Sequence, residues 1–153
     1  MIKANDLKPG DLVRVCEDNW QIKKGTICEI LSIDLFHKYC SELNWVTVSN
    51  PNSYIDKVRL RCIDIEGIPL TLEILEKNKW KLHKHHKRDS YDDVSWSSYR
   101  KPEETNISLR FYPEEKAFFL FLYAQEISET PIRYVHQFQH LLFGLNINSE
   151  MEV

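Results

Sequence analysis

The clearest periodic pattern of hydrophobic residues lies near the C-terminal end of the chain. Five apolar side chains recur there at steps of three and four residues: Tyr134, Phe138, Leu141, Leu142 and Leu145. This spacing places them on one face of an α-helix. Thr130 supplies a capping hydroxyl, and Pro131 suits the first helical position, where no amide hydrogen is needed. The pattern therefore predicts a long helix over residues 131–145, ended by Asn146 in a left-handed conformation.

Short apolar segments separated by turns fill the first half of the chain. Strands are predicted over residues 12–16, 20–22, 26–34, 44–48 and 59–65. Five short strands at such close spacing are typical of a small antiparallel barrel or a strongly bent sheet. Residues 9–15 and 24–30 also resemble the opening of SH3-like barrels, including those of KOW domains associated with ribosomes and transcription. We therefore expect an SH3-like β-barrel over residues 1–66.

The second half, residues 67–153, alternates between helix and strand patterns. Thr71 is placed to cap a short helix over residues 72–78. Strands are predicted over residues 80–83, 96–99, 107–111 and 116–123, with an exposed polar segment over residues 84–93. Together the two halves predict an α+β protein with a barrel followed by an antiparallel sheet, a short helix and a long C-terminal helix.

The last predicted strand is apolar on both of its faces, since residues 117–123 contain no charged side chain. A strand that is covered on one side only alternates between apolar and polar residues. We therefore expect Phe118, Leu120 and Leu122 to contact a protein partner or a second copy of the chain. The alternative is that the first half of the same chain covers them.

Composition favours a soluble cytoplasmic protein without a membrane partner. The 153 residues carry a net charge of −3, and no apolar segment approaches the length of a membrane span. The first six residues are too polar for a signal peptide. The spacings of Cys16, Cys28, Cys40 and Cys62 match no zinc ribbon. Reduced thiols are expected, and two disulfides in an exported protein are the alternative.

A basic segment at residues 77–88 holds six Lys and Arg residues and no acidic residue. Basic side chains beside an aromatic ring can bind a phosphate backbone and stack a base. The candidates for nucleic-acid binding are Lys79, Trp80, Lys81, Lys84, Lys87 and Arg88. The alternatives are a solvated hairpin neutralised by the acidic residues at 89–93, and metal chelation by His83, His85 and His86.

No catalytic, metal or cofactor motif is recognisable. The four glycines are isolated, so no phosphate-binding loop is present, and neither a GxSxG nor an HExxH motif occurs. His136 and His140 lie one helical turn apart, but glutamines rather than a glutamate stand between them. We expect a protein that is not an enzyme and needs no cofactor.

Two phrases of the second half resemble a family of small uncharacterised proteins common in gut-associated bacteria, their prophages and mobile elements. Residues 67–78 resemble its "PIPLTEEIL" phrase, and residues 134–145 resemble its "YVHQLQNLYFAL" phrase. His140 and Gly144 depart from that pattern. The resemblance implies a lineage and carries over no catalytic residue. The predicted function is a non-catalytic protein-binding or adaptor module of phage or mobile-element origin, and the alternative is a nucleic-acid-binding accessory protein.

Overall fold

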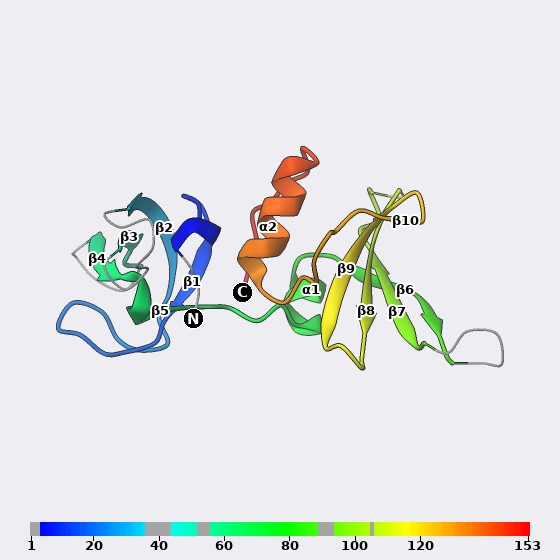
Figure 1. The fold of residues 1–153 in the computed structure, drawn as a ribbon, viewed down its shortest axis with the longest axis horizontal. Helices are drawn as coiled ribbons and strands as arrows, with labels where there is room; N and C mark the ends of the chain where they lie inside the picture. Colours follow the sequence, from blue (N-terminus) through cyan, green and yellow to red (C-terminus); the bar gives the residue numbers. More distant parts are fainter. Residues whose placement is uncertain (1–3, 36–43, 52–55, 89–93, 105) are drawn as a thin grey trace. The chain divides into compact units, whose positions relative to one another are not determined.

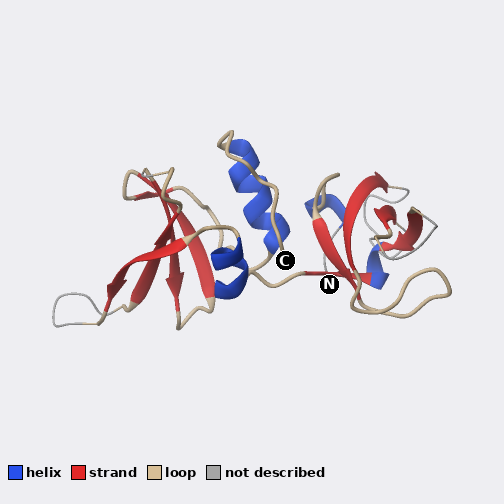
Figure 2. Cartoon of the chain, turned by 180° about the vertical axis from the view of Figure 1, so that it is seen from behind, coloured by secondary structure: helices blue, strands red, loops and turns tan. Residues whose placement is uncertain are grey.

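The computed structural model describes the chain except for residues 1–3, 36–43, 52–55, 89–93 and 105. It is a mixed α+β protein with two antiparallel five-stranded sheets and one main helix (Figures 1 and 2). The chain divides into two compact units, Met1–Ile68 and Pro69–Val153. The boundary predicted from the sequence lay after residue 66. Each unit is described by itself.

The N-terminal unit is built on a sheet of five short strands in the order β4-β3-β2-β1-β5. Its elements are η1 (Ala4–Asp6), β1 (Leu12–Val15), β2 (Ile27–Asp34), β3 (Trp45–Ser49), β4 (Lys57–Arg61), η3 (Cys62–Asp64) and β5 (Ile65–Gly67). Alternate residues of the strands are buried, as Val46 and Val48 on β3 and Val58 and Leu60 on β4 illustrate. These inward side chains form the hydrophobic core of the unit.

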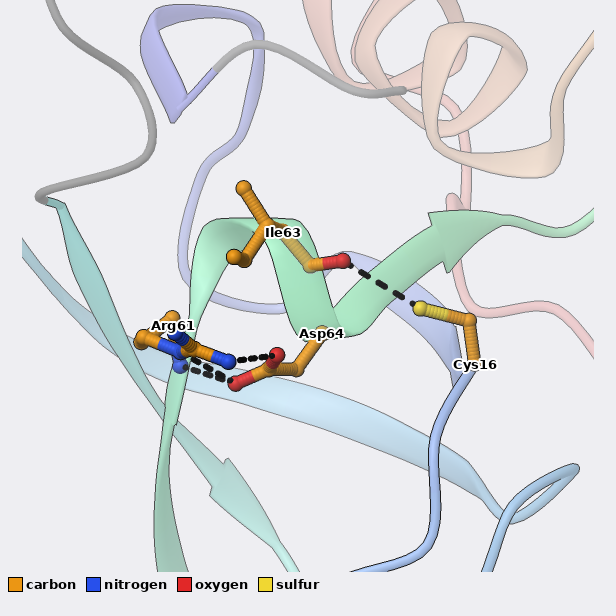
Figure 3. A network of polar contacts seen from close by, with 4 residues as sticks. All are labelled: Cys16, Arg61, Ile63 and Asp64. Atoms are coloured by element: carbon orange, nitrogen blue, oxygen red, sulfur yellow. Dashed lines mark hydrogen bonds and ion pairs between the residues drawn. The ribbon is translucent and has the colours of Figure 1, made fainter.

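Two predicted strands of this unit differ from the structure. Residues 20–22 form a bend instead of a strand. The strand predicted over residues 59–65 is divided by η3, where the Arg61 guanidinium donates to both carboxylate oxygens of Asp64 at 2.9 and 3.1 Å. The backbone amide of Arg61 donates to the same carboxylate, and the Cys16 thiol donates to the carbonyl of Ile63 at 3.3 Å (Figure 3). These contacts stabilise a turn that strand propensity does not reveal.

The expected closed barrel is not formed by the strand pairs of this unit. Among the described residues, β4 and β5 are the two ends of the sheet and do not pair with each other. The hydrogen-bonded sheet is therefore open. Strand β1 pairs with β2 on one side and with β5 on the other.

The C-terminal unit combines the second sheet with both α-helices. Its strand order is β10-β9-β8-β7-β6, so β6 is an edge strand. Its elements are α1 (Leu72–Lys77), β6 (Lys81–His86), β7 (Trp96–Arg100), β8 (Ile107–Tyr112), β9 (Ala117–Leu122), β10 (Gln125–Glu126) and α2 (Val135–Gly144). Helix α1 begins as predicted, because the Thr71 hydroxyl accepts a hydrogen bond from the amide of Ile74 at 3.3 Å.

Strand register assigns the side chains of this sheet to two faces. Leu109 of β8 lies opposite Tyr99 of β7 and Leu120 of β9, and all three are buried. Their strand neighbours point to the other face. The core of the unit also contains Trp80, which precedes β6, and Phe138 of α2. The centroids of these two rings lie 5.3 Å apart.

Helix α2 begins four residues later than the sequence pattern predicted, so it has ten residues and Thr130 does not cap it. Residues 131–134 are extended because their backbone pairs with other segments. The amide and carbonyl of Ile132 both bond to the backbone of Phe118, at 2.8 and 3.0 Å, and the carbonyl of Arg133 accepts from Leu70. The Gln137 side chain then accepts from the amides of Arg133 and Tyr134. The periodic apolar pattern could not separate this strand-like entry from the helix that follows.

The C-terminal end of α2 agrees with the prediction. Asn146 has a φ of 57°, in the left-handed region, and its amide donates to the carbonyl of Phe143. The next amide, that of Ile147, donates to the carbonyl of Leu142 at 2.9 Å. These two bonds form a Schellman motif. No helix among the described residues is long and apolar enough to cross a membrane.

Candidate functional site

The basic segment singled out by the sequence does not act as one surface. Trp80 is only 1% exposed and packs on Phe138, so its ring is unavailable for stacking on a base. Lys79 occupies the turn before β6 with a φ of 65°. Lys81 and Lys84 are exposed on β6, and Lys87 and Arg88 are exposed beyond its end. The structure therefore separates the predicted aromatic ring from the predicted cations.

A different tryptophan meets one of these cations. Lys84 and His86 of β6 lie on the same sheet face as Trp96 of β7, because Lys84 pairs with Ser98 and His86 pairs with Trp96. Arg110 of β8 also lies opposite Ser98 and continues this face toward β9. We call this surface the cationic–aromatic face and define it by seven residues: Lys84, His86, Trp96, Ser98, Arg110, Phe119 and Phe121.

The side chains of this face form a row that alternates rings and cations across four strands. The His86 ring stacks on Trp96 with centroids 5.3 Å apart and planes 20° apart. The Arg110 guanidinium carbon lies 4.5 Å from the Trp96 centroid and 3.8 Å from the Phe121 centroid. Lys84 Nζ lies 5.5 Å from the Trp96 centroid. Such cation–π contacts each contribute about 0.5–2 kcal/mol, so they favour positions in which the cations lie over the rings.

Lys84 and Arg110 are the two cations of this row that lie over the Trp96 ring. Among the described residues, neither Lys84 nor Arg110 forms an ion pair with a carboxylate. These two cations belong to a chain whose overall net charge is −3. A surface of this kind attracts anions at short range even when the whole protein does not.

Sequence reasoning missed Trp96 and Arg110 because their significance depends on strand register. The alternation of residues 107–111 does place Arg110 on the polar side of its strand. That pattern cannot show that β7 brings Trp96 alongside it, since the two residues lie on different strands. Proximity along the chain pointed instead to Trp80, whose burial removes it from the surface.

The residues predicted to form an apolar interface lie mainly inside the chain. Phe118 and Leu120 are 2% and 0% exposed, and Leu122 is half-buried. Phe118 packs against Phe111 with ring centroids 4.8 Å apart. The chain itself therefore covers these two buried side chains in this conformation.

Of the described thiols of the N-terminal unit, those of Cys28 and Cys62 are buried and that of Cys16 is partly buried. Burial raises the pKa of Cys28 and that of Cys62 from an ordinary 9.0 to about 11. Burial and the nearby carboxylate of Glu66 also raise the pKa of Cys16. Because the thiolate is the nucleophilic form, these three groups are poor nucleophiles at neutral pH. Cys40 lies outside the described residues.

The histidines do not gather into a metal site within the described part of the chain, where no group of three His, Cys, Asp or Glu residues could hold an ion. His85 Nδ1 bonds with the Ser97 hydroxyl at 2.9 Å, and the rings of His136 and His140 meet edge to face.

Comparison with protein families, curated proteins and solved structures found no match for this chain. The fold and the site by themselves define an α+β protein of two units that carries a fixed row of cations and rings on one sheet face. The activity of the protein is therefore inferred from the geometry of that face.

Proposed function

We propose that this protein is a non-catalytic binding protein that holds nucleic acid on its cationic–aromatic face. The observation that carries the proposal is the position of Arg110. Its guanidinium lies against both Trp96 and Phe121 and has no carboxylate partner among the described residues. A guanidinium that lies against rings and forms no ion pair in the described part of the chain is well suited to bind a phosphate oxygen.

The same geometry favours contact with the phosphate backbone over stacking of bases. His86 stacks on the Trp96 ring, and Arg110 and Lys84 also lie over it. A base that stacked on Trp96 would compete with these neighbours for the ring. Contacts to phosphates carry no direct sequence information. We therefore propose binding that is independent of sequence and sensitive to salt.

The other predicted function, binding of a protein partner, has less support from the geometry. It was based on apolar side chains that were expected to be buried by a partner. Phe118 and Leu120 are instead buried within the chain itself. Addition of a partner strand to the edge strand β6 is also disfavoured, because β6 presents Lys81 and Lys84. Charged residues on an edge strand oppose such pairing.

For the N-terminal unit we propose an SH3-like architecture. The support is its order β4-β3-β2-β1-β5 together with the 3-10 helix η3 between β4 and β5. A reducing, cytoplasmic setting is supported by Cys16, Cys28 and Cys62, which are all free thiols. The proposed origin in a phage or mobile element rests on the two sequence phrases of the second half.

The direct test is the binding of a fluorescein-labelled single-stranded oligonucleotide of mixed sequence, followed by anisotropy in low salt. Arg110→Met keeps an aliphatic side chain against Trp96 and Phe121 but removes the charge, and we expect it to weaken binding about tenfold. Arg110→Lys keeps the charge, so its affinity for the oligonucleotide should fall less than that of Arg110→Met. Arg133→Met removes an exposed arginine of the same unit that is not one of the seven residues of this face, and it should bind like the wild type.

The proposal is wrong if the wild-type protein does not bind the oligonucleotide at low salt. It is equally wrong if Arg110→Met and Arg133→Met weaken binding by the same factor, because the cationic–aromatic face would then have no special role. Circular dichroism of each variant establishes that the fold is retained.

A further inference from the structure

A second feature of the C-terminal unit lies where β6 begins and β7 ends. A pocket of about 260 Å³ is lined there by Lys81, Leu82, His83, Arg100, Lys101 and Pro102. None of these residues belongs to the seven that define the cationic–aromatic face. The pocket is small compared with the sites that proteins use for drug-sized ligands, which suits it to a small ligand.

The charge of this pocket has one sign. Three of its lining residues, Lys81, Arg100 and Lys101, are cations, and no lining residue among the described part of the chain is acidic. Strand register places Lys81 directly opposite Arg100. Like charges directly opposite each other on neighbouring strands destabilise a sheet, so the pair favours an anion between or beside the two side chains.

The acidic residues nearest in sequence face a different cavity. Glu103 and Glu104 line a larger space of about 470 Å³, to which Lys81 and Lys101 also contribute. Glu150 and Glu152 of the C-terminal segment line that space as well. Arg100 is not part of this larger cavity, and among the described residues it forms no ion pair.

Arg100 also has an unused hydrogen-bond donor. Its Nε is buried and has no hydrogen-bond partner among the described residues. A buried guanidinium nitrogen without an acceptor is unfavourable, because folding removes its water and supplies nothing in exchange. Arg100 also lines the pocket, so an oxyanion bound there would lie beside this guanidinium.

The third cation is held in place by the core. Lys101 Nζ lies 6.0 Å from the centroid of the Trp80 ring, and Trp80 is itself fixed against Phe138. The cation–π contact limits the positions open to the ammonium group. The pocket thus combines the planar guanidinium of Arg100 with the ammonium groups of Lys81 and Lys101.

We propose that this pocket binds a phosphate group, with Arg100 as the central donor and Lys81 and Lys101 as its charge partners. The ligand chemistry is that of a tetrahedral oxyanion of charge near −2, which guanidinium and ammonium groups recognise through charge-assisted hydrogen bonds. Two sources supply it, inorganic phosphate and the terminal phosphate of a nucleic-acid strand. The site does not depend on the proposed binding face.

The first experiment titrates the full chain with inorganic phosphate and follows the phosphorus NMR line width and the thermal midpoint. Potassium chloride at matched ionic strength is the control for general salt effects. We expect saturable binding by the wild type. Arg100→Lys keeps the charge but lacks Nε, and we expect its affinity for phosphate to fall at least fivefold. Arg133→Lys makes the same chemical change outside the pocket and should leave the affinity unchanged.

The second experiment compares one oligonucleotide with and without a 5′-phosphate. If the strand end is the source, the phosphorylated form binds more tightly and Arg100→Lys removes that advantage. If free phosphate is the source, the two oligonucleotides bind alike while inorganic phosphate still saturates the pocket. Absence of saturable phosphate binding in the first experiment, or binding that Arg100→Lys does not weaken, overturns the proposal.

These outcomes are separate from those that test the cationic–aromatic face. The phosphate titration contains no nucleic acid, so it succeeds or fails independently of the proposed function. Arg110→Met should weaken oligonucleotide binding while leaving inorganic phosphate binding within a factor of two of the wild type.

Discussion

At the scale of single residues, the position of Arg110 gives the C-terminal unit its proposed chemistry. A guanidinium on a solvated surface is normally free to turn toward a nearby carboxylate. Here two rings lie within 4.5 Å of it, and no carboxylate partner is found among the described residues. The rings hold the side chain without neutralising it, which lowers the entropy that a bound phosphate must overcome.

The environment of Trp96 leads to a prediction about bases. Its ring is already in contact with His86 and Arg110. An abasic oligonucleotide should therefore bind within about threefold of the same strand with its bases, as measured by competition in the anisotropy assay. Stacking contributes about 1–3 kcal/mol per base where it occurs. A tenfold or larger loss with the abasic strand would show that a base displaces one of these neighbours.

The buried thiols give a prediction about pH. The pKa of Cys28 and of Cys62 is raised by burial from 9.0 to about 11. In a Cys40→Ser background, iodoacetamide should alkylate both residues far more slowly in the folded protein than in urea at pH 8.

The same shift predicts how stability changes in alkaline solution. Between pH 9 and 11 the unfolded chain has released these protons and the folded chain has not, so the free energy of unfolding should fall as the pH rises. Urea titrations across this range check the sign. A Cys28→Ala, Cys62→Ala variant should show a smaller fall, and an unchanged slope would contradict the assignment.

At the scale of secondary-structure elements, the sequence predicted helix caps correctly at two positions. Thr71 does cap α1, and Asn146 does end α2 in the left-handed region. Both signals depend on a few neighbouring residues only. The predicted start of α2 was wrong because Ile132 forms backbone hydrogen bonds with Phe118. Phe118 lies 14 residues earlier in the chain, and no local pattern identifies it as the partner of Ile132.

The end of α2 provides a direct stability test. A left-handed conformation costs a residue with a β-carbon about 1–2 kcal/mol, and asparagine tolerates it better than alanine does. Asn146, with a φ of 57°, should therefore accept glycine with little change in the free energy of unfolding. Asn146→Ala should lower that free energy by about 1 kcal/mol in urea denaturation. Equal stability of the two variants would contradict this account of the helix end.

The packing of α2 supplies a larger effect. Phe138 is fully buried and contacts Trp80 at a centroid distance of 5.3 Å. Truncation of a buried phenylalanine costs about 3–5 kcal/mol. Phe138→Ala should lower the free energy of unfolding of the C-terminal unit by that amount, seen in thermal or urea denaturation. Phe143→Ala is the matched control, because Phe143 is 74% exposed on the same helix.

At the scale of the whole molecule, the division into two units and the α+β class could be anticipated from strand spacing and helix periodicity. The candidate site could not. Of the residues singled out for nucleic-acid binding, Lys84 lies on the cationic–aromatic face, whereas Trp80 is in the core. The face exists only after β6, β7, β8 and β9 align, and strand register is a property of the assembled sheet that residue spacing does not encode.

Because the protein has a net charge of −3, its overall charge does not attract nucleic acid. The proposed binding should therefore depend on a few cations of the cationic–aromatic face. The measurement that tests this most directly is the slope of log K against log KCl concentration for a single-stranded oligonucleotide. Each phosphate contact contributes about 0.7 to its magnitude. We predict that Lys84→Met with Arg110→Met lowers the magnitude by about 1.4, while Arg59→Met in the N-terminal unit does not change it. A double variant whose slope equals that of the wild type would contradict the central claim.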